Sequence, residues 1–375
     1  MEQEIRLSNI PGMSVGQMVE MLSKAYSGLI NRNLPISLMP SVMLWGPPGA
    51  GKSQGVREIA NEIGKQTGKK VCVTDVRLLL FNPIDLRGIP TANEDRTLAI
   101  WLKPKIFQMD ESDKTVNILF LDEISAAPQS VQAAAYQITL DRTVGEHRLP
   151  DNCIVIAAGN RVTDKSVAFK MPKALANRLM HLEVEISTDS WLDWAVNKGI
   201  NPIIIGFLSS HKDRLMAFNP VSEELAFATP RSWEMVSNIL NNVENDIDEA
   251  FSMISGLVGI GAASELRTWC KVYGRLPDVK DIFSGKAKAE AAKKFSPSEL
   301  YSVISAMTIY ARGHQDDIDG IAHSLKYAQA FPLDFSVMMI KNYMSIGDSF
   351  REKLMQVPEF MRWAETKGRL LNGVV

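Results

Sequence analysis

The alternation of apolar and polar positions divides the chain into an α/β part and helical parts. From Val42 onward, five short apolar runs alternate with segments of helical periodicity. The runs cover residues 42–45, 71–76, 117–121, 154–158 and 182–186. Continuous apolar strands separated in this way predict a parallel sheet that helices cover on both faces. We therefore expect an α/β core over residues 40–188.

Helical periodicity dominates on both sides of this core. Apolar residues at helical spacing predict a helix over residues 14–31, capped by Ser14, within an N-terminal segment 1–39. The strand signal stops after the core, and residues 189–278 are predicted to form an all-helical domain. A polar, lysine-rich stretch then leads into a predicted C-terminal helical extension over residues 279–375.

Residues 46–53 carry the strongest chemical signal in the chain. They follow an apolar run, precede a helix-like segment and read Gly46, Pro47, Pro48, Gly49, Ala50, Gly51, Lys52 and Ser53. This is the strand, G-x-x-x-x-G-K-[ST], helix pattern of a phosphate-binding loop (P-loop, Walker A). Its glycines let consecutive backbone N–H groups point at one anion, which the dipole of the following helix also attracts. The pattern predicts that ATP binds here, with Lys52 reaching the β- and γ-phosphates and the Ser53 hydroxyl ligating Mg²⁺.

Polar residues follow two other predicted strands at the edge where ligands of such sheets bind. Asp122 and Glu123 end the run 117–121 in the manner of a Walker B motif, and Asn160 follows the run 154–158. Because ligands lie beyond the carboxyl ends of parallel strands, Asp122 is expected to hold Mg²⁺ mostly through its water shell. Glu123 is expected to polarise the water that attacks the γ-phosphate. On local chemistry, Asn160 is equally well explained as a nucleotide contact and as a residue that favours strand-end turns.

Together with two later stretches, these motifs resemble an AAA+ ATPase of the MoxR branch, the dynein-related AAA type. The resemblance covers about residues 40–245 and rests on residues 46–53, 118–123, 158–160, 175–178 and 229–232. It implies a P-loop AAA+ core over residues 40–188 and a helical lid over residues 189–278. It also implies a ring of identical subunits, usually a hexamer.

The resemblance further assigns three polar residues. It implies that Asn160 is the sensor 1 amide, that Arg178 is an arginine finger reaching the neighbouring subunit's γ-phosphate, and that Arg231 is the sensor 2 arginine. A helix dipole alone also favours a cation at Arg178, in the last turn of a predicted helix. Arg231 lies in a first helical turn, behind the predicted cap Thr229 and Pro230, where the dipole disfavours a cation unless an anion is near. Its position is therefore independent support for a nucleotide contact.

Two stretches resemble the surface inserts of this family. Residues 82–104 are predicted as a long loop or hairpin, and residues 139–149 as a helix end followed by a hairpin about Gly145. Either they project toward a partner or the ring pore, or they are plain lids and connections. The sequence does not choose between these interpretations.

Composition narrows the classes of function. The 375 residues are 46% hydrophobic and 22% charged. The formal net charge is −2 and the pI is near 6.3, so the protein as a whole has no positive electrostatic potential that would attract a polyanion. Cys72, Cys153 and Cys270 are too widely spaced for a disulfide framework or a metal cluster, and are predicted to be small core residues in a reducing cytosol. The longest low-charge stretches fall short of the ~20 apolar residues of a membrane span. We expect a soluble, cytoplasmic protein.

The sequence thus predicts an ATP-hydrolysing ring that remodels or activates a protein partner in a chaperone-like manner. The resemblance makes a von Willebrand factor A domain protein the best guess for that partner. The alternative is a ring motor acting with a nuclease or a nucleic-acid-processing system, against which the near-neutral charge argues. An intact Glu123 argues against a scaffold that binds ATP without hydrolysing it.

Overall fold

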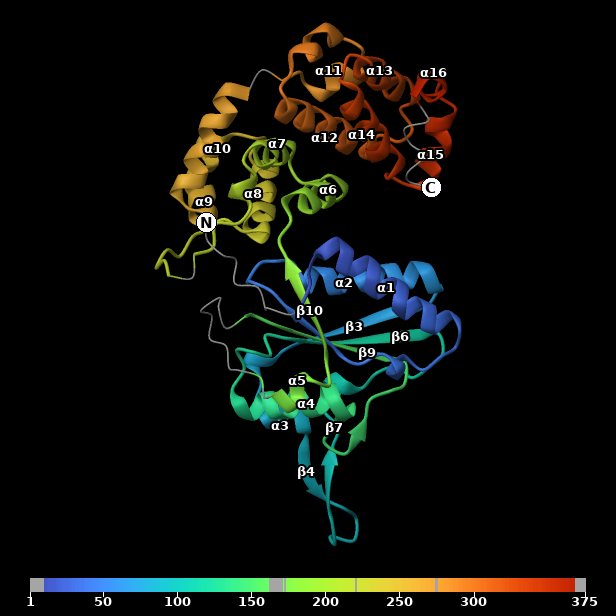
Figure 1. Ribbon diagram of the computed structural model, residues 1–375, viewed down its shortest axis with the longest axis vertical. Helices are drawn as coiled ribbons and strands as arrows, with labels where there is room; N and C mark the ends of the chain where they lie inside the picture. The colour runs from blue at the N-terminus through green and yellow to red at the C-terminus, as the bar shows by residue number, and fades with distance from the viewer. Residues whose placement is uncertain (1–9, 162–170, 172, 220, 274–275, 368–375) are drawn as a thin grey trace. The chain divides into compact units, whose positions relative to one another are not determined.

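The computed structural model describes residues 10–161, 171, 173–219, 221–273 and 276–367 (Figure 1). Contacts separate the chain into two compact units. The first runs to Ile186 and includes residues 219–222, and the second comprises residues 187–218 and 223–375. The finer division into four parts stays a prediction.

A parallel six-stranded sheet forms the centre of the first unit. The strand order is β1-β10-β2-β9-β6-β3, and every neighbouring pair is parallel. The strands are β1 (Gly12–Ser14), β2 (Val42–Trp45), β3 (Lys70–Arg77), β6 (Thr115–Asp122), β9 (Cys153–Gly159) and β10 (Met180–Glu185). The five predicted strands are confirmed. The sixth, β1, was missed because it has only three residues and no apolar run.

Helices cover both faces of this sheet, as predicted for the α/β class (Figure 1). Helices α1 (Val15–Asn31) and α2 (Lys52–Thr67) share one apolar cluster with alternate residues of the strands. Helix α4 (Gln129–Asp141) packs with the intervening strand residues on the opposite face. The alternation of side chains along each strand thus produces two cores, one on each face.

The first helix begins where the sequence predicts. Ser14 caps it: the Gln17 N–H donates to the Ser14 hydroxyl at 3.3 Å, and the Ser14 N–H donates to the Gln17 side chain at 3.0 Å. Gly55 allows α1 to approach α2, because a Cβ there would come within 2.4 Å of the terminal methyl of Met18. The N-terminal helix is therefore packed directly against the helix that follows the phosphate loop.

Two hairpins extend from the first unit. One consists of β4 (Ile89–Ala92) and β5 (Ala99–Leu102) after the short helix α3 (Pro83–Arg87), and the other of β7 (Thr143–Val144) and β8 (His147–Arg148). The hairpin predicted about Gly145 is confirmed. The two hairpins touch, because His147 Nε2 bonds to the carbonyl of Trp101 at 2.7 Å.

The regular structure of the second unit is helical, with no strand among its described residues, as predicted. Its helices are α6 (Thr188–Lys198), α7 (Pro202–Ser210), α8 (Pro230–Asn242), α9 (Ile247–Val258), α10 (Ile260–Tyr273), α11 (Val279–Phe283), α12 (Pro297–Gly313), α13 (Ile318–Ala328), α14 (Leu333–Met344), α15 (Asp348–Met355) and α16 (Pro358–Lys367). Short 3₁₀ segments cover Ile36–Leu38, Leu78–Leu80, Lys105–Phe107, Lys212–Arg214 and Ala289–Lys294 across both units.

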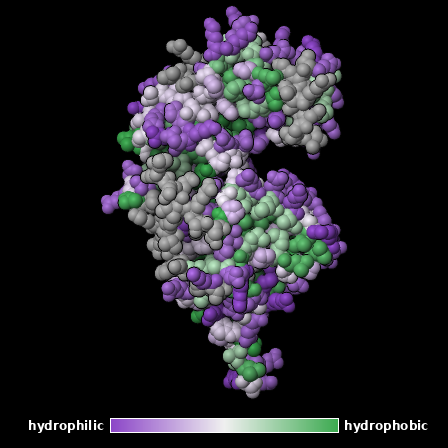
Figure 2. All heavy atoms as spheres, viewed as in Figure 1, coloured by the Kyte–Doolittle hydropathy of each residue, from purple (hydrophilic) through white to green (hydrophobic). Residues whose placement is uncertain are grey.

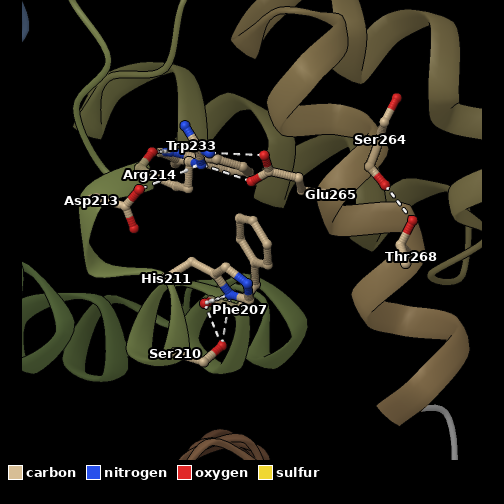
Figure 3. A network of polar contacts seen from close by, with 9 residues as sticks. All are labelled: Phe207, Ser210, His211, Asp213, Arg214, Trp233, Ser264, Glu265 and Thr268. Atoms are coloured by element: carbon tan, nitrogen blue, oxygen red, sulfur yellow. Dashed lines mark hydrogen bonds and ion pairs between the residues drawn. The ribbon is translucent and has the colours of Figure 1, made fainter.

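A polar network joins three parts of the second unit (Figure 3). The Arg214 guanidinium donates to both carboxylate oxygens of Glu265 on α10, at 2.7 and 2.8 Å. Trp233 on α8 donates its indole N–H to the carbonyl of Arg214 at 2.8 Å, and its ring lies 5.5 Å from that of Phe207 on α7. These bonds tie the 3₁₀ segment Lys212–Arg214, which follows α7, to α10 and to the first turn of α8.

Candidate active site

The phosphate loop connects the carboxyl end of β2 to the amino end of α2. Gly49 and Gly51 have φ angles of +78° and +89°, which other residues rarely adopt. Gly46 lies against β10, since a Cβ there would come within 2.7 Å of the carbonyl oxygen of Val184. The glycines of the motif are therefore needed for the backbone path and for close packing on the neighbouring strand.

Lys52, the first residue of α2, curls back over this loop. Its Nζ donates to the carbonyl oxygens of Gly46 at 2.6 Å and Pro47 at 3.0 Å, and to Oδ1 of Asn160 at 3.1 Å. The lysine is only 8% exposed. The ammonium group is thus held at the mouth of the loop and beside the amide that the sequence predicts to be a sensor.

Ser53 and Asp122 meet at the same place. The Ser53 hydroxyl donates to Oδ2 of Asp122 at 2.8 Å, while Oδ1 of Asp122 accepts the Glu123 N–H at 2.9 Å. The strand order explains why: β2, β9 and β6 are neighbours, so their carboxyl ends converge. The structure therefore brings together Lys52, Ser53, Asp122 and Asn160 at one edge of the sheet.

Glu123 occupies a strained backbone conformation directly after β6. Its φ is +60°, a region that costs a residue with a side chain on the order of 1–3 kcal/mol. The turn is held by the Ile124 N–H, which donates to the carbonyl of Ala158 at 3.0 Å, and by the Ala126 N–H, which donates to the carbonyl of Glu123 at 3.0 Å. The half-buried carboxylate has no hydrogen-bond or ion-pair partner in the described part of the chain.

Ser125 belongs to this site and was missed at the sequence level. Its buried hydroxyl accepts the backbone N–H of Asn160 at 2.9 Å. Gly159 makes the contact sterically possible, because a Cβ there would come within 2.9 Å of the Ser125 oxygen. A serine after two carboxylates has no recognisable pattern, and the contact joins residues 35 positions apart.

Arg178 lies on the surface of the first unit. It follows α5 (Lys173–Ala176) in a turn that the Leu179 N–H closes by donating to the Ala176 carbonyl at 3.2 Å. The side chain is exposed and has no hydrogen-bond or ion-pair partner among the residues described. It is available to a group outside this chain.

Arg231 is exposed in the first turn of α8, in the second unit. The predicted helix start is confirmed: Thr229 is the cap, Pro230 follows it, and the Ser232 N–H donates to the Thr229 hydroxyl at 3.0 Å. Because Arg231 belongs to the other unit, its contact with nucleotide stays a prediction.

The remaining chemical features are structural. Burial raises the pKa of the Cys153 thiol to about 11 and that of Cys270 to about 12, so both stay protonated at neutral pH. Cys153 is buried as predicted, whereas Cys72 and Cys270 are only partly covered. Within the described ranges, no group of three or more His, Cys, Asp or Glu residues could by itself hold a metal ion. No helix in these ranges is long and apolar enough to cross a membrane.

Comparison with known protein families finds a match for most of the first unit. Residues 42–186 match the model of the ATPase family associated with various cellular activities (AAA). These residues form an AAA domain. The match covers β2 to β10 and includes the phosphate loop, both carboxylates, Asn160 and Arg178. It supports ATP binding and ATPase activity for this part of the chain.

Other comparisons add little. No curated protein matches the sequence. Among solved structures, NtrX from Brucella abortus in complex with ATP is 14% identical, with a TM-score of 0.39 over 92% of this chain and 70% of that one. A RuvB mutant of Thermotoga maritima is 13% identical (TM-score 0.34; 78% and 84% covered), and C. elegans PCH-2 is 14% identical (TM-score 0.33; 70% and 68%). At these values the likeness carries no argument about activity.

Proposed function

We propose that this protein is a Mg²⁺-dependent, ATP-hydrolysing ring ATPase of the MoxR branch of the AAA+ class. It acts in the cytoplasm and remodels or activates a protein partner in a chaperone-like manner. The observation that supports this best is the convergence of Lys52, Ser53, Asp122 and Asn160 within an AAA domain, beside the strained Glu123.

ATP binding follows from the loop geometry. The backbone N–H groups of residues 49–53, which include the amino end of α2, favour phosphate. The Lys52 ammonium group can hydrogen-bond to phosphate as it does to a carbonyl, and it also gains the attraction between opposite charges, which a neutral carbonyl does not offer. The β- and γ-phosphates therefore replace the carbonyls of Gly46 and Pro47 as preferred acceptors for Lys52.

The pair of Ser53 and Asp122 fits Mg²⁺. A hydroxyl and a carboxylate 2.8 Å apart are hard oxygen donors of the kind that Mg²⁺ prefers. Ser53 would ligate the ion directly and Asp122 mostly through water. When bound, the ion neutralises charge on the β- and γ-phosphates.

Hydrolysis depends on Glu123 and Asn160. The Glu123 carboxylate takes the proton of the attacking water, and its strained backbone fixes the direction in which the side chain leaves the strand. Oδ1 of Asn160 accepts from Lys52, which leaves its Nδ2 to donate to the water or the γ-phosphate. Ser125 holds the backbone of Asn160 in place.

Because of the exposed Arg178, ATP hydrolysis in one subunit is proposed to depend on the arginine of the adjacent subunit. A trans arginine stabilises the charge of the phosphoryl-transfer transition state, and it can do so only if subunits meet at the nucleotide. We accordingly expect a homo-oligomeric ring, six subunits by family resemblance, with Arg231 completing each site from the second unit.

The joined hairpins are the proposed contact with the partner protein, for which a von Willebrand factor A domain is the best guess. The β4–β5 hairpin exposes Ile89, Leu98, Ile100 and Leu102 at 60%, 66%, 41% and 55% (Figure 2). Exposed apolar side chains close together are typical of protein contacts. The His147–Trp101 hydrogen bond joins the two hairpins. Gly145 also lets the β7–β8 turn approach the end of α3, because a Cβ there would lie 2.7 Å from the carbonyl oxygen of Arg87.

Partner capture tests this proposal. Tagged Glu123→Gln protein, which is expected to bind ATP without cleaving it, is incubated with lysate and ATP and then isolated. The double variant Lys52→Ala, Glu123→Gln is the matched control, since it keeps the same surface but loses nucleotide. A partner retained only by the single variant supports the proposal, and equal retention by both contradicts ATP-driven engagement.

A further inference from the structure

His181 lies between the phosphate loop and the turn that carries Arg178. It is the second residue of β10. Its Nδ1 accepts the indole N–H of Trp45 at 2.9 Å, and its Nε2 bonds to the carbonyl of Ala176 at 2.7 Å. Trp45 is the residue directly before Gly46. A single side chain thus spans from the base of the phosphate loop to the end of α5.

The roles of the two ring nitrogens follow from the partners. An indole N–H can only donate, so Nδ1 of His181 must accept, and a carbonyl can only accept, so Nε2 must carry the hydrogen. The Trp45 and His181 rings are also nearly parallel, 17° apart with centroids separated by 6.0 Å. Both rings therefore have fixed orientations.

The carbonyl that His181 holds is the one that closes the Arg178 turn. The Ala176 oxygen accepts both the His181 Nε2 hydrogen and the Leu179 N–H, at 2.7 and 3.2 Å. Asn177 and Arg178 are the two residues between these ends. Displacement of the Ala176 carbonyl would therefore reorient the segment that presents Arg178.

Strand β10 receives two further contacts from the nucleotide site. Gly46 packs on the carbonyl of Val184. Arg161, which follows Asn160, pairs with the fully buried Glu183 at 2.7 Å. The phosphate loop and the Asn160 turn thus both contact β10, and β10 begins two residues after Arg178.

From these contacts we infer that His181 is a positioning residue that holds the Arg178 turn in register with the subunit's own phosphate loop. His181 therefore affects ATP hydrolysis in the neighbouring subunit, because Arg178 acts there. The inference rests on the proposed ring function and adds to it a route from nucleotide in one site to hydrolysis in the next.

Mixed rings test where the effect of His181 is exerted. A donor subunit carries Glu123→Gln, which blocks its own hydrolysis and keeps Arg178. An acceptor subunit carries Arg178→Ala, which keeps Glu123 and needs its neighbour's arginine. Phosphate release at saturating ATP is measured for the parent mixture, and again with His181→Phe added to the donor alone or to the acceptor alone.

Loss of activity should depend on which subunit lacks the imidazole. With His181→Phe in the donor, turnover should fall about tenfold or more, because ångström displacements of a charge-stabilising group cost up to ~10²-fold. With the same change in the acceptor, turnover should stay close to that of the parent mixture. A merely structural role would lower both arms alike, which would overturn the inference, as would an unchanged donor arm.

Three further variants sharpen the test. Trp45→Phe in the donor removes the indole N–H and should reproduce the loss, whereas His181→Gln keeps one acceptor and one donor and should restore much of the activity. His323→Phe is the matched control: its ring nitrogen bonds to the Phe283 carbonyl at 3.0 Å in the second unit, and donor activity should be retained.

The two failures are distinguishable. An inactive parent mixture would overturn the ring mechanism and the role of His181 with it. An active parent mixture with equal arms would overturn the role of His181 alone. Thermal unfolding checks that each variant folds, and His181→Gln and Trp45→Phe keep the test decisive if His181→Phe does not fold.

Discussion

Replacement of Ser125 by alanine tests whether the Asn160 turn is positioned by a single hydroxyl. The change removes one oxygen and leaves the surrounding volume nearly unchanged, at a residue that is 3% exposed. The lost bond joins the Ser125 hydroxyl to the Asn160 N–H at 2.9 Å. A buried donor left without its acceptor costs about 1–3 kcal/mol, and because the Asn160 hydrogen bond is part-buried we expect the lower part of this range.

The expected effect on catalysis follows from this energy. If about 1–2 kcal/mol of it appears as misplacement of Asn160 in the transition state, turnover falls roughly 5- to 30-fold. ATP affinity should change little, because the lost bond is to the Asn160 N–H and the change leaves the phosphate loop and Lys52 in place. Steady-state phosphate release and calorimetric ATP titration measure the two quantities separately.

Ser27→Ala is the matched control. Ser27 is also a buried serine, 4% exposed, but its hydroxyl has no hydrogen-bond partner within the described ranges. Its replacement should leave turnover unchanged. If Ser125→Ala also hydrolyses ATP at the normal rate, then the hydroxyl does not position Asn160 and the argument from the hydrogen bond is refuted.

Three other perturbations give further expected outcomes. Arg178→Ala should lower ATP hydrolysis by ~10³ or more while calorimetric ATP affinity stays near normal, as for arginine fingers generally; full activity would reduce Arg178 to a helix-end cation. Arg231→Ala should weaken ATP affinity or turnover without lowering the melting temperature, and unchanged values of both would count against its nucleotide contact. Gly206→Ala should lower the melting temperature, because its Cβ would lie 1.7 Å from the Ser302 hydroxyl, and overpacking of this kind costs about 1–3 kcal/mol. Gly256→Ala, in open space on α9, should be neutral or stabilising through helix propensity, so equal destabilisation by both changes would contradict the packing argument.

Much of the fold was predictable because its signals are local. The strands around Val42 and Ile118 are continuous apolar runs, and the starts of α1 and α8 carry capping residues, Ser14 and Thr229, that act within one turn. Strand β1 has no such signal: its three residues are a strand because they pair with β10. Short edge strands depend on tertiary contact and cannot be deduced from periodicity.

The site was predictable to the extent that motifs define it. Lys52, Ser53, Asp122 and Asn160 follow from spacing and from the convergence of parallel strand ends. Contacts between distant residues were not predictable: the Trp45 and His181 side chains meet across 136 positions. The left-handed backbone of Glu123 was equally invisible, because no glycine marks it.

The central claim is that this edge of the sheet binds and hydrolyses ATP through Glu123. The most direct measurement is ATP titration and phosphate release on the same preparation of Glu123→Gln protein, beside wild type. The amide keeps the shape of the side chain but cannot accept the proton, so ATP affinity should be retained and phosphate release abolished. Normal phosphate release by Glu123→Gln would contradict the account, because another residue would then activate the water.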